Sequence, residues 1–269
     1  MMNLNDKFAG VPTFYYFNSD LKGPLKDHMD RNLINLKVPN YQRVSTSKYT
    51  KGNVSEWKDL LINRSDYKLP ITTAAFSISV LEFLKHWYDN TEEETLIISK
   101  DTLDFGLVQY FHFDWEFLMD KLPYDWDCFI MGFENLNYIP FYLHQIMPAH
   151  MFNVALLNRR YVKKLIKLHC VGDKYNLSNF SANKNFGLYS GTPDYFIGHC
   201  GKTYCFPMFP NHTDFFDKTT KKYSLVKGCR LAYYDWWRSE KKRYSMNDIF
   251  TYGKPNDKGM LKKIWNYVK

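Results

Sequence analysis

A short apolar run that ends in polar residues constrains the fold of this chain more than any other stretch. Residues 96–98 are Leu-Ile-Ile, an uninterrupted apolar segment typical of a strand buried on both faces of a largely parallel sheet. Residues 99–101, Ser-Lys-Asp, follow directly. Ligands of open α/β sheets bind at the carboxyl ends of the strands, so this change predicts a binding site there. An ordinary polar turn with a capping Asp is the alternative interpretation.

Strand and helix patterns alternate along the chain, which predicts an α/β fold with a mostly parallel sheet flanked by helices. The predicted strands are residues 12–18, 41–44, 96–98, 127–133 and 203–209. The predicted helices are residues 21–34, 72–88, 115–122, 153–169 and 193–198. For the helix over 153–169, one face would carry Val154, Leu157, Tyr161, Leu165 and Leu168, and Lys and Arg residues fall mostly on the other faces.

The positive charge of the chain is concentrated at its carboxyl end. Residues 218–269 contain 14 Lys+Arg and 4 Asp+Glu, a net charge of +10. The whole chain has 36 and 28, so residues 1–217 hold 22 and 24, a net charge of −2. We therefore expect a domain over 1–217 and a basic, aromatic-rich extension over 218–269 packed on or beside it. Such an extension suits nucleic acid, an anionic glycolipid surface or a diphosphate, and solvated closing helices are the alternative.

The composition excludes several classes of protein. Hydrophobic residues make up 45% of the 269 residues and charged residues 24%, which argues against disorder. No stretch approaches the roughly 20 apolar residues of a membrane-spanning helix. The five cysteines form no Cys-x-x-Cys pair, which argues against a disulfide scaffold and a structural zinc site. We therefore expect a cytoplasmic protein, in the host cytoplasm if it is viral.

Several short motifs stand in an order that resembles glycosyltransferase family 25, the group of lipooligosaccharide and collagen galactosyltransferases. The likeness is greatest to versions carried by bacteriophages and large viruses, and it covers roughly residues 11 to 215. The motifs are Phe14–Asp20, Arg31, Thr73–Leu81, Ser99–Asp101, Leu122–Asp127, His150–Asn153 and Thr192–Phe196. The family's Ser-His is incomplete here, since Thr73–Leu81 lacks the His, and Ser99–Asp101 stands where the family has Glu-Asp-Asp.

This resemblance implies a GT-A-like, Rossmann-type fold that transfers a hexose from a nucleotide-sugar such as a UDP-sugar, with inversion and commonly with Mn²⁺. The acceptor would be a glycan, a lipopolysaccharide or other glycolipid, a protein or a modified DNA base. Asp194 is then the candidate general base and Lys100 a second catalytic residue. The expected donor-binding residues are Tyr16, Asn18, Arg31, Ser99 and Asp101, and the expected metal ligands are Asp101 and His212.

The departures from the family motif leave two interpretations of the site open. Ser99 and Lys100 replace two acids, so the motif loses two negative charges and gains a positive one. A dication would be held less well, and Lys100 itself could neutralise the diphosphate in a metal-independent enzyme. The alternative is a non-catalytic protein on a degenerate glycosyltransferase fold that binds nucleotide-sugars or nucleic acid.

Overall fold

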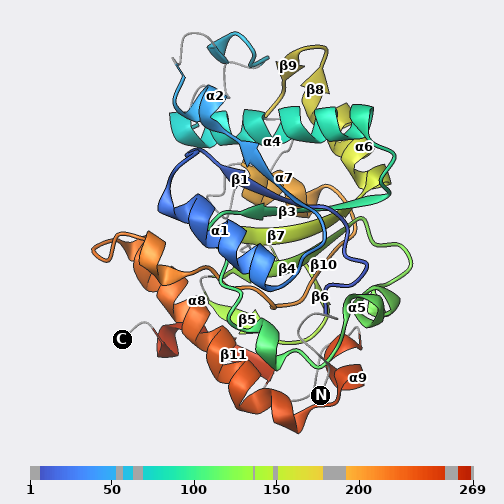
Figure 1. Cartoon of the computed structure of the whole chain (residues 1–269), viewed down its shortest axis with the longest axis vertical. Helices are drawn as coiled ribbons and strands as arrows, with labels where there is room; N and C mark the ends of the chain where they lie inside the picture. Colours follow the sequence, from blue (N-terminus) through green and yellow to red (C-terminus); the bar gives the residue numbers. More distant parts are fainter. Residues whose placement is uncertain are drawn as a thin grey trace.

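The structure is a computed structural model that describes residues 7–52, 57–62, 69–135, 137–147, 151–177, 192–251 and 260–267. Its centre is a seven-stranded sheet with the order β2-β1-β3-β7-β4-β10-β6 (Figure 1). The strands of this sheet are β1 (Phe14–Asn18), β2 (Tyr41–Ser45), β3 (Thr95–Lys100), β4 (Cys128–Glu134), β6 (His144–Gln145), β7 (Met151–Asn158) and β10 (Thr203–Cys205). Five of them run in one direction, and β7 and β6 run in the other. The predicted α/β class with a mostly parallel sheet is therefore confirmed.

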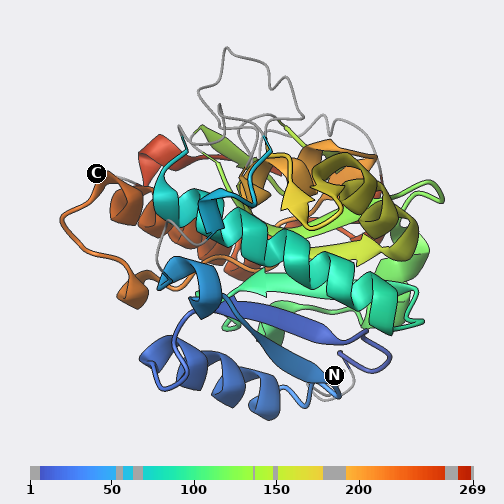
Figure 2. The same ribbon diagram turned by 90° about the horizontal axis from the view of Figure 1, so that it is seen from above.

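Helices cover both faces of this sheet. Figures 1 and 2 show α1 on one side of it and α6 and α7 on the other. The helices are α1 (Pro24–Asn35), α2 (Ser47–Thr50), α4 (Ile71–Asn90), α5 (Trp115–Lys121), α6 (Arg159–His169), α7 (Pro193–His199), α8 (Lys221–Arg238) and α9 (Met246–Phe250). Two small antiparallel pairs join β5 (Tyr138–Pro140) to β11 (Leu261–Lys263) and β8 (Cys170–Val171) to β9 (Lys174–Tyr175). Short 3-10 turns span Val108–Tyr110, Thr213–Phe215, Glu240–Arg243 and Ile264–Asn266.

The first half of the predicted helix over 153–169 is wrong. Residues 151–158 form β7, and α6 begins only at Arg159. The apolar run from Val154 to Leu157 fits a helix face by its spacing, but it equally fits a strand buried on both faces, and its side chains are fully buried. The boundary is set by Asn158, whose side chain accepts a hydrogen bond from the Tyr161 amide at 2.7 Å and caps α6.

The predicted strand over 203–209 is shorter than expected, because β10 ends at Cys205. Pro207 lacks an amide hydrogen and cannot continue a regular ladder. The chain still follows β4, since the Phe206 amide donates to the Ile130 carbonyl at 3.0 Å. At Gly132, where the pairing of β4 with β7 shifts register, a Cβ atom would lie 2.1 Å from the Phe209 carbonyl oxygen. Only glycine permits this close approach of the two backbones.

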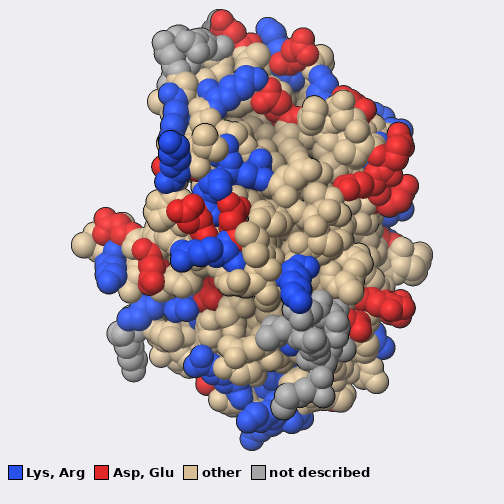
Figure 3. All heavy atoms as spheres, viewed as in Figure 1, with Lys and Arg blue, Asp and Glu red and all other residues tan. Residues whose placement is uncertain are grey.

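The carboxyl-terminal segment packs on the core through its longest helix. α8 buries Tyr233, Trp236 and Trp237, and the Phe141 ring stacks on Trp236 with centroids 4.6 Å apart. Lys and Arg side chains gather at the lower end of the molecule in Figure 3, where α8 ends and the turn containing Lys241–Arg243 follows. Among the described helices, none combines the length and the apolar character needed to cross a membrane. His150, from one of the family-like motifs, lies outside the described residues.

Candidate functional site

A polar cleft of about 360 Å³ lies at the carboxyl ends of β1, β3 and β4. Parallel strands end at the same edge of a sheet, so polar residues that follow them in the sequence meet there. The cleft gathers four of the predicted site residues, which are Asn18, Lys100, Asp101 and Asp194. The remaining lining residues are Phe17, Ser19, Thr46, Thr50, Phe76, Thr102, Glu134, Asn211, Phe216 and Lys222.

Asn18 joins the ends of β1 and β3. Its side-chain amide is almost completely buried and donates to Asp101 Oδ2 at 2.8 Å. Its Oδ1 accepts from the Asp20 amide at 2.9 Å and from Arg43 Nη1 at 3.3 Å. Burial raises the pKa of Asp101, although the hydrogen bond from Asn18 acts in the opposite direction. The Asp101 carboxyl is therefore held in position but is costly to ionise.

Lys100 and Asp194 form an ion pair across the cleft. Lys100 is the last residue of β3, and Asp194 lies in the first turn of α7, which begins at Pro193. Lys100 Nζ donates to Asp194 Oδ1 at 2.7 Å. Burial favours the neutral amine, but the carboxylates of Asp194 and Glu134 outweigh this effect and raise the pKa of Lys100. The Lys100 side chain is therefore protonated and contributes a fixed positive charge to the cleft.

Glu134 is a cleft residue that the sequence analysis missed. It ends β4, its side chain is buried, and its Oε1 accepts from Asn211 Nδ2 at 2.5 Å. Asn211 also donates to Asn153 Oδ1 at 2.9 Å and accepts from Thr102 Oγ1 at 2.8 Å. Burial raises the pKa of Glu134, and Lys100 partly opposes the shift. The signal was present, because Glu134 is the polar residue that ends β4 after an apolar stretch, and Lys100 ends β3 in a similar way.

The other predicted site residues do not line the cleft. The Tyr16 side chain is buried and its hydroxyl donates to Asp30 Oδ1 at 2.6 Å. Ser99 is fully buried in β3, and the exposed Arg31 donates from Nε to the Asp27 carbonyl at 3.1 Å. His212 lies after β10, where its Nδ1 accepts from the Asp214 amide at 3.3 Å. None of these four side chains is brought into contact with the Lys100–Asp194 pair by any described interaction.

Two carboxylates of the cleft each have one oxygen engaged by a hydrogen-bond donor. Asp101 Oδ2 already accepts from Asn18, and Asp194 Oδ1 accepts from Lys100. The ammonium of Lys100 supplies the positive charge that a metal would otherwise bring between carboxylates. In the part of the chain that the structure describes, no group of three or more His, Cys, Asp or Glu side chains is arranged to hold a metal ion.

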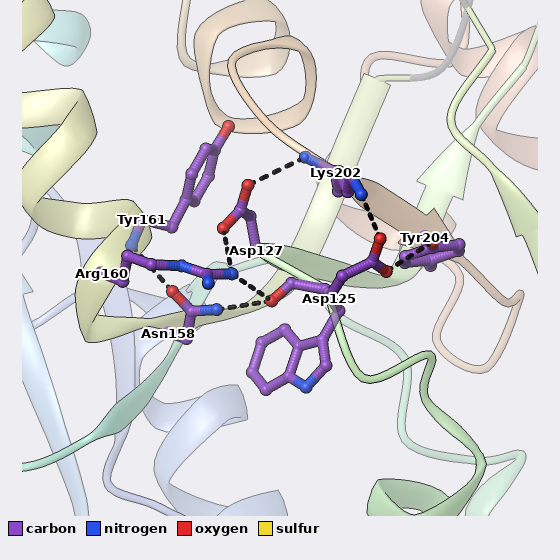
Figure 4. A network of polar contacts seen from close by, with 8 residues as sticks. Asp125, Asp127, Asn158, Arg160, Tyr161, Lys202 and Tyr204 are labelled. Atoms are coloured by element: carbon purple, nitrogen blue, oxygen red, sulfur yellow. Dashed lines mark hydrogen bonds and ion pairs between the residues drawn. The ribbon is translucent and has the colours of Figure 1, made fainter.

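A second charged cluster lies at the opposite ends of the strands (Figure 4). Asp127 precedes β4 and accepts from the Lys202 amide at 3.0 Å and from Arg160 Nη2 at 2.8 Å. Asp125 pairs with the Lys202 ammonium and accepts from the Tyr204 hydroxyl at 3.1 Å. These contacts tie the starts of β4 and β10 to α6. Asp125 and Asp127 therefore bracket the start of β4.

Comparisons with known proteins give little beyond this geometry. No family model and no curated protein matches the chain. Among solved structures, the chain is similar to the crystal structure of A197 from STIV, with 11% sequence identity. The match covers 74% of this chain and 84% of that chain, with a TM-score of 0.40. A likeness this distant carries no argument about function.

Proposed function

We propose that this protein is a glycosyltransferase that moves a hexose from a nucleotide-sugar, with a UDP-sugar as the first candidate, to a glycan or glycolipid acceptor. The observation that carries the proposal is the Lys100–Asp194 pair in a polar cleft at the strand ends. A cation and a carboxylate side by side are what such a transfer needs, because one reacting oxygen gains negative charge while another loses a proton. The likeness to family 25 glycosyltransferases in the order of motifs supports the same activity.

The donor would lie along the cleft with its diphosphate toward Lys100. Phe17, Phe76, Thr46 and Thr50 line the cleft and offer apolar and hydroxyl contacts to a nucleoside. The charged residues of the same cleft would hold the diphosphate and the sugar. Open α/β sheets bind nucleotides in this crevice.

In the proposed reaction, an acceptor hydroxyl loses its proton to the carboxylate of Asp194. The hydroxyl oxygen forms a bond to the anomeric carbon while the bond from that carbon to the diphosphate oxygen breaks. The leaving diphosphate takes the electron pair, and the ammonium of Lys100 stabilises the charge that develops on it. Attack from the face opposite the leaving group inverts the anomeric centre.

The transfer would not require a dication, because Lys100 provides the positive charge within the cleft. This part of the proposal follows from the donor set described above, in which two carboxylate oxygens are already occupied by Asn18 and Lys100. Electrostatic stabilisation by a fixed cation in a partly buried site is strong, since little reorganisation accompanies the reaction.

The test is the release of free nucleotide from a panel of UDP-, GDP- and CMP-sugars, each with Mn²⁺ and with EDTA. Equal release from one donor under both conditions supports a metal-independent transferase and names its sugar. Release that disappears with EDTA contradicts the metal-independent part of the proposal. Silence across the panel, with no donor raising the melting temperature, supports the non-catalytic alternative. Silence with a raised melting temperature for one donor means that the donor binds and that the acceptor must be supplied.

A further inference from the structure

The first turn of α8 reaches the cleft, although it belongs to the basic carboxyl-terminal segment. Lys222, the second residue of α8, lines the same cleft as Lys100 and Asp194. Its side chain is exposed, and its ammonium lies over the Phe216 ring, 5.4 Å from the centroid. More than 120 residues separate Lys222 from Lys100 in the sequence, so only the packing of α8 brings the two cations to one site.

Buried polar contacts fix α8 in this position. Arg230 Nε donates to Asp104 Oδ2 at 2.5 Å, and the Tyr234 hydroxyl donates to Asp104 Oδ1 at 3.0 Å. Asp104 is buried in the segment that follows β3. The two contacts therefore attach α8 to the same segment that carries Lys100 and Asp101. Because the Asp104 carboxylate is shielded from water, the strength of its contacts with α8 depends closely on the distances and angles between the groups.

A second attachment ties α8 to the end of β4. The Tyr233 hydroxyl donates to the Phe133 carbonyl at 3.0 Å and accepts from the Phe133 amide at 3.1 Å. Phe133 immediately precedes Glu134, the buried carboxylate of the cleft. The Trp237 indole also donates to the Pro207 carbonyl at 2.9 Å. The helix that carries Lys222 is thus held by the strand ends that form the site.

The distribution of charges in the cleft indicates the role of Lys222. The cleft is lined by the carboxyl groups of Asp101, Glu134 and Asp194 and by the amines of Lys100 and Lys222. Lys100 is hydrogen-bonded to Asp194, whereas Lys222 makes no ion pair with a carboxylate of the described residues. Its charge acts on the Glu134 carboxyl without a direct bond and partly opposes the rise in pKa that burial causes there. The ammonium can therefore still bind an incoming anion, and without it Lys100 would be the only amine of the cleft to offset the carboxyl groups.

We propose that Lys222 binds the diphosphate of the donor together with Lys100, so that the carboxyl-terminal segment completes the active site. This inference rests on the proposed function for the identity of the anion. A flexible lysine suits this role, because it contributes a point charge that can follow the phosphates. The positive charge of α8 near the cleft then serves the donor rather than nucleic acid.

The experiment compares Lys222→Ala with Lys227→Ala by titration calorimetry at low salt. Both residues are exposed lysines of α8 and both changes remove one positive charge, but Lys227 does not line the cleft. The probes are inorganic pyrophosphate, UDP and uridine, which lacks phosphate. We expect Lys222→Ala to weaken pyrophosphate and UDP binding about ten- to hundredfold, as loss of a charged hydrogen bond does. Uridine binding should be the same in all three proteins, and Lys227→Ala should match the unmodified protein.

Two further measurements separate the possible failures. Lys222→Arg keeps the charge and should retain most of the pyrophosphate affinity, and equal melting temperatures show that the variants are folded. Equal pyrophosphate affinity in Lys222→Ala and the unmodified protein overturns the inference, as does the absence of pyrophosphate and UDP binding in the unmodified protein. Pyrophosphate binding that depends on Lys222, with neither nucleotide release nor a raised melting temperature from any sugar donor, supports the anion site and counts against the glycosyltransferase.

Discussion

The two ends of the central sheet carry charged clusters with opposite properties. At the amino ends of β4 and β10, the hydrogen bond from Lys202 lowers the pKa of Asp125, so the negative charge of this carboxylate is stabilised by folding. At the carboxyl ends, burial raises the pKa of Asp101 and of Glu134, so folding opposes their negative charge. Carboxyl groups that a fold holds at a cost to its own stability are typical of functional sites.

The two clusters also differ in what their contacts connect. At the amino ends, Asp127 bonds to a backbone amide and to Arg160, so it joins elements of the fold. At the carboxyl ends, Lys100 and Asp194 bond to each other. Both clusters line hollows with room for a ligand, of about 460 Å³ at the amino ends and about 360 Å³ at the carboxyl ends, so the difference lies in the contacts. Variants of each cluster, measured for both turnover and stability, test whether the two ion pairs have different roles.

The largest effect is expected from Lys100→Ala. Loss of the cation should lower turnover of the identified donor by about 10²–10³-fold, the usual cost of removing one group that stabilises a developing negative charge. Nucleotide release at saturating donor measures it. The matched control is Lys202→Ala, which removes a lysine from the other cluster and should leave turnover unchanged. If Lys100→Ala and Lys202→Ala had similar turnover, the two clusters would not differ in function.

The next effect is on stability, at the amino ends of the strands. Asp127→Ala leaves the Lys202 amide and Arg160 without their acceptor, so the free energy of unfolding should fall by about 1–3 kcal/mol. Urea denaturation measures the change, and turnover of the folded protein should stay as it is. A variant with normal stability and reduced turnover would mean that this cluster, too, takes part in function.

Glu134→Gln should make the protein more stable by about 0.5–2 kcal/mol near neutral pH. The substituted side chain keeps an amide oxygen to accept from Asn211 but carries no buried charge. The raised pKa of Glu134 fixes the sign of the pH dependence. Above its ordinary value of 4.5, the unfolded carboxyl loses its proton before the folded one, so the stability of the unmodified protein falls as pH rises.

The advantage of Glu134→Gln should therefore be absent below pH 4.5 and grow above it until the folded carboxyl has also ionised. Denaturation of both proteins at a series of pH values on either side of 4.5 measures the difference. A variant that is less stable at every pH would show that the Glu134 charge supports the fold.

The smallest effect is expected from Arg160→Ala. The Arg160 side chain is 69% exposed, so its ion pair with Asp127 is screened by solvent and should contribute at most about 1 kcal/mol. The difference from the unmodified protein should shrink further in roughly 1 M NaCl, where the screening length is about 3 Å. If the free energy of unfolding falls by more than this and the loss does not shrink in salt, the Arg160–Asp127 ion pair stabilises the fold as much as the contact between Asp127 and the Lys202 amide.

Much of the site is predictable from the sequence because strand ends are visible in it. The change from apolar to polar residues after residues 96–98 placed Lys100 and Asp101 at the cleft, and Pro193 placed Asp194 at the start of a helix. Glu134 ends β4 with the same kind of change, so it was accessible to the same argument.

Other features depend on tertiary contacts that a local pattern does not contain. The spacing of Val154 and Leu157 fits a helix and a strand equally, and only the neighbouring β3 and β4 decide for the strand. Lys222 reaches the cleft because Asp104 and Phe133 fix α8, and these partners are about 100 or more residues away in sequence. Likewise, Tyr16 follows the strand pattern that places Asn18 at the site, but its hydroxyl bonds to Asp30 instead.

The position of β7 has a consequence for how the protein is made. In the sheet order, β7 alone stands between β3 on one side and β4 on the other, and it pairs with both. During synthesis, β1, β2, β3 and β4 all emerge before it. The two halves of the sheet therefore remain unjoined until residues 151–158 have left the ribosome. Lys100 and Glu134 come to one site only after β7 has been inserted between β3 and β4. A formed cleft therefore indicates that the domain has folded.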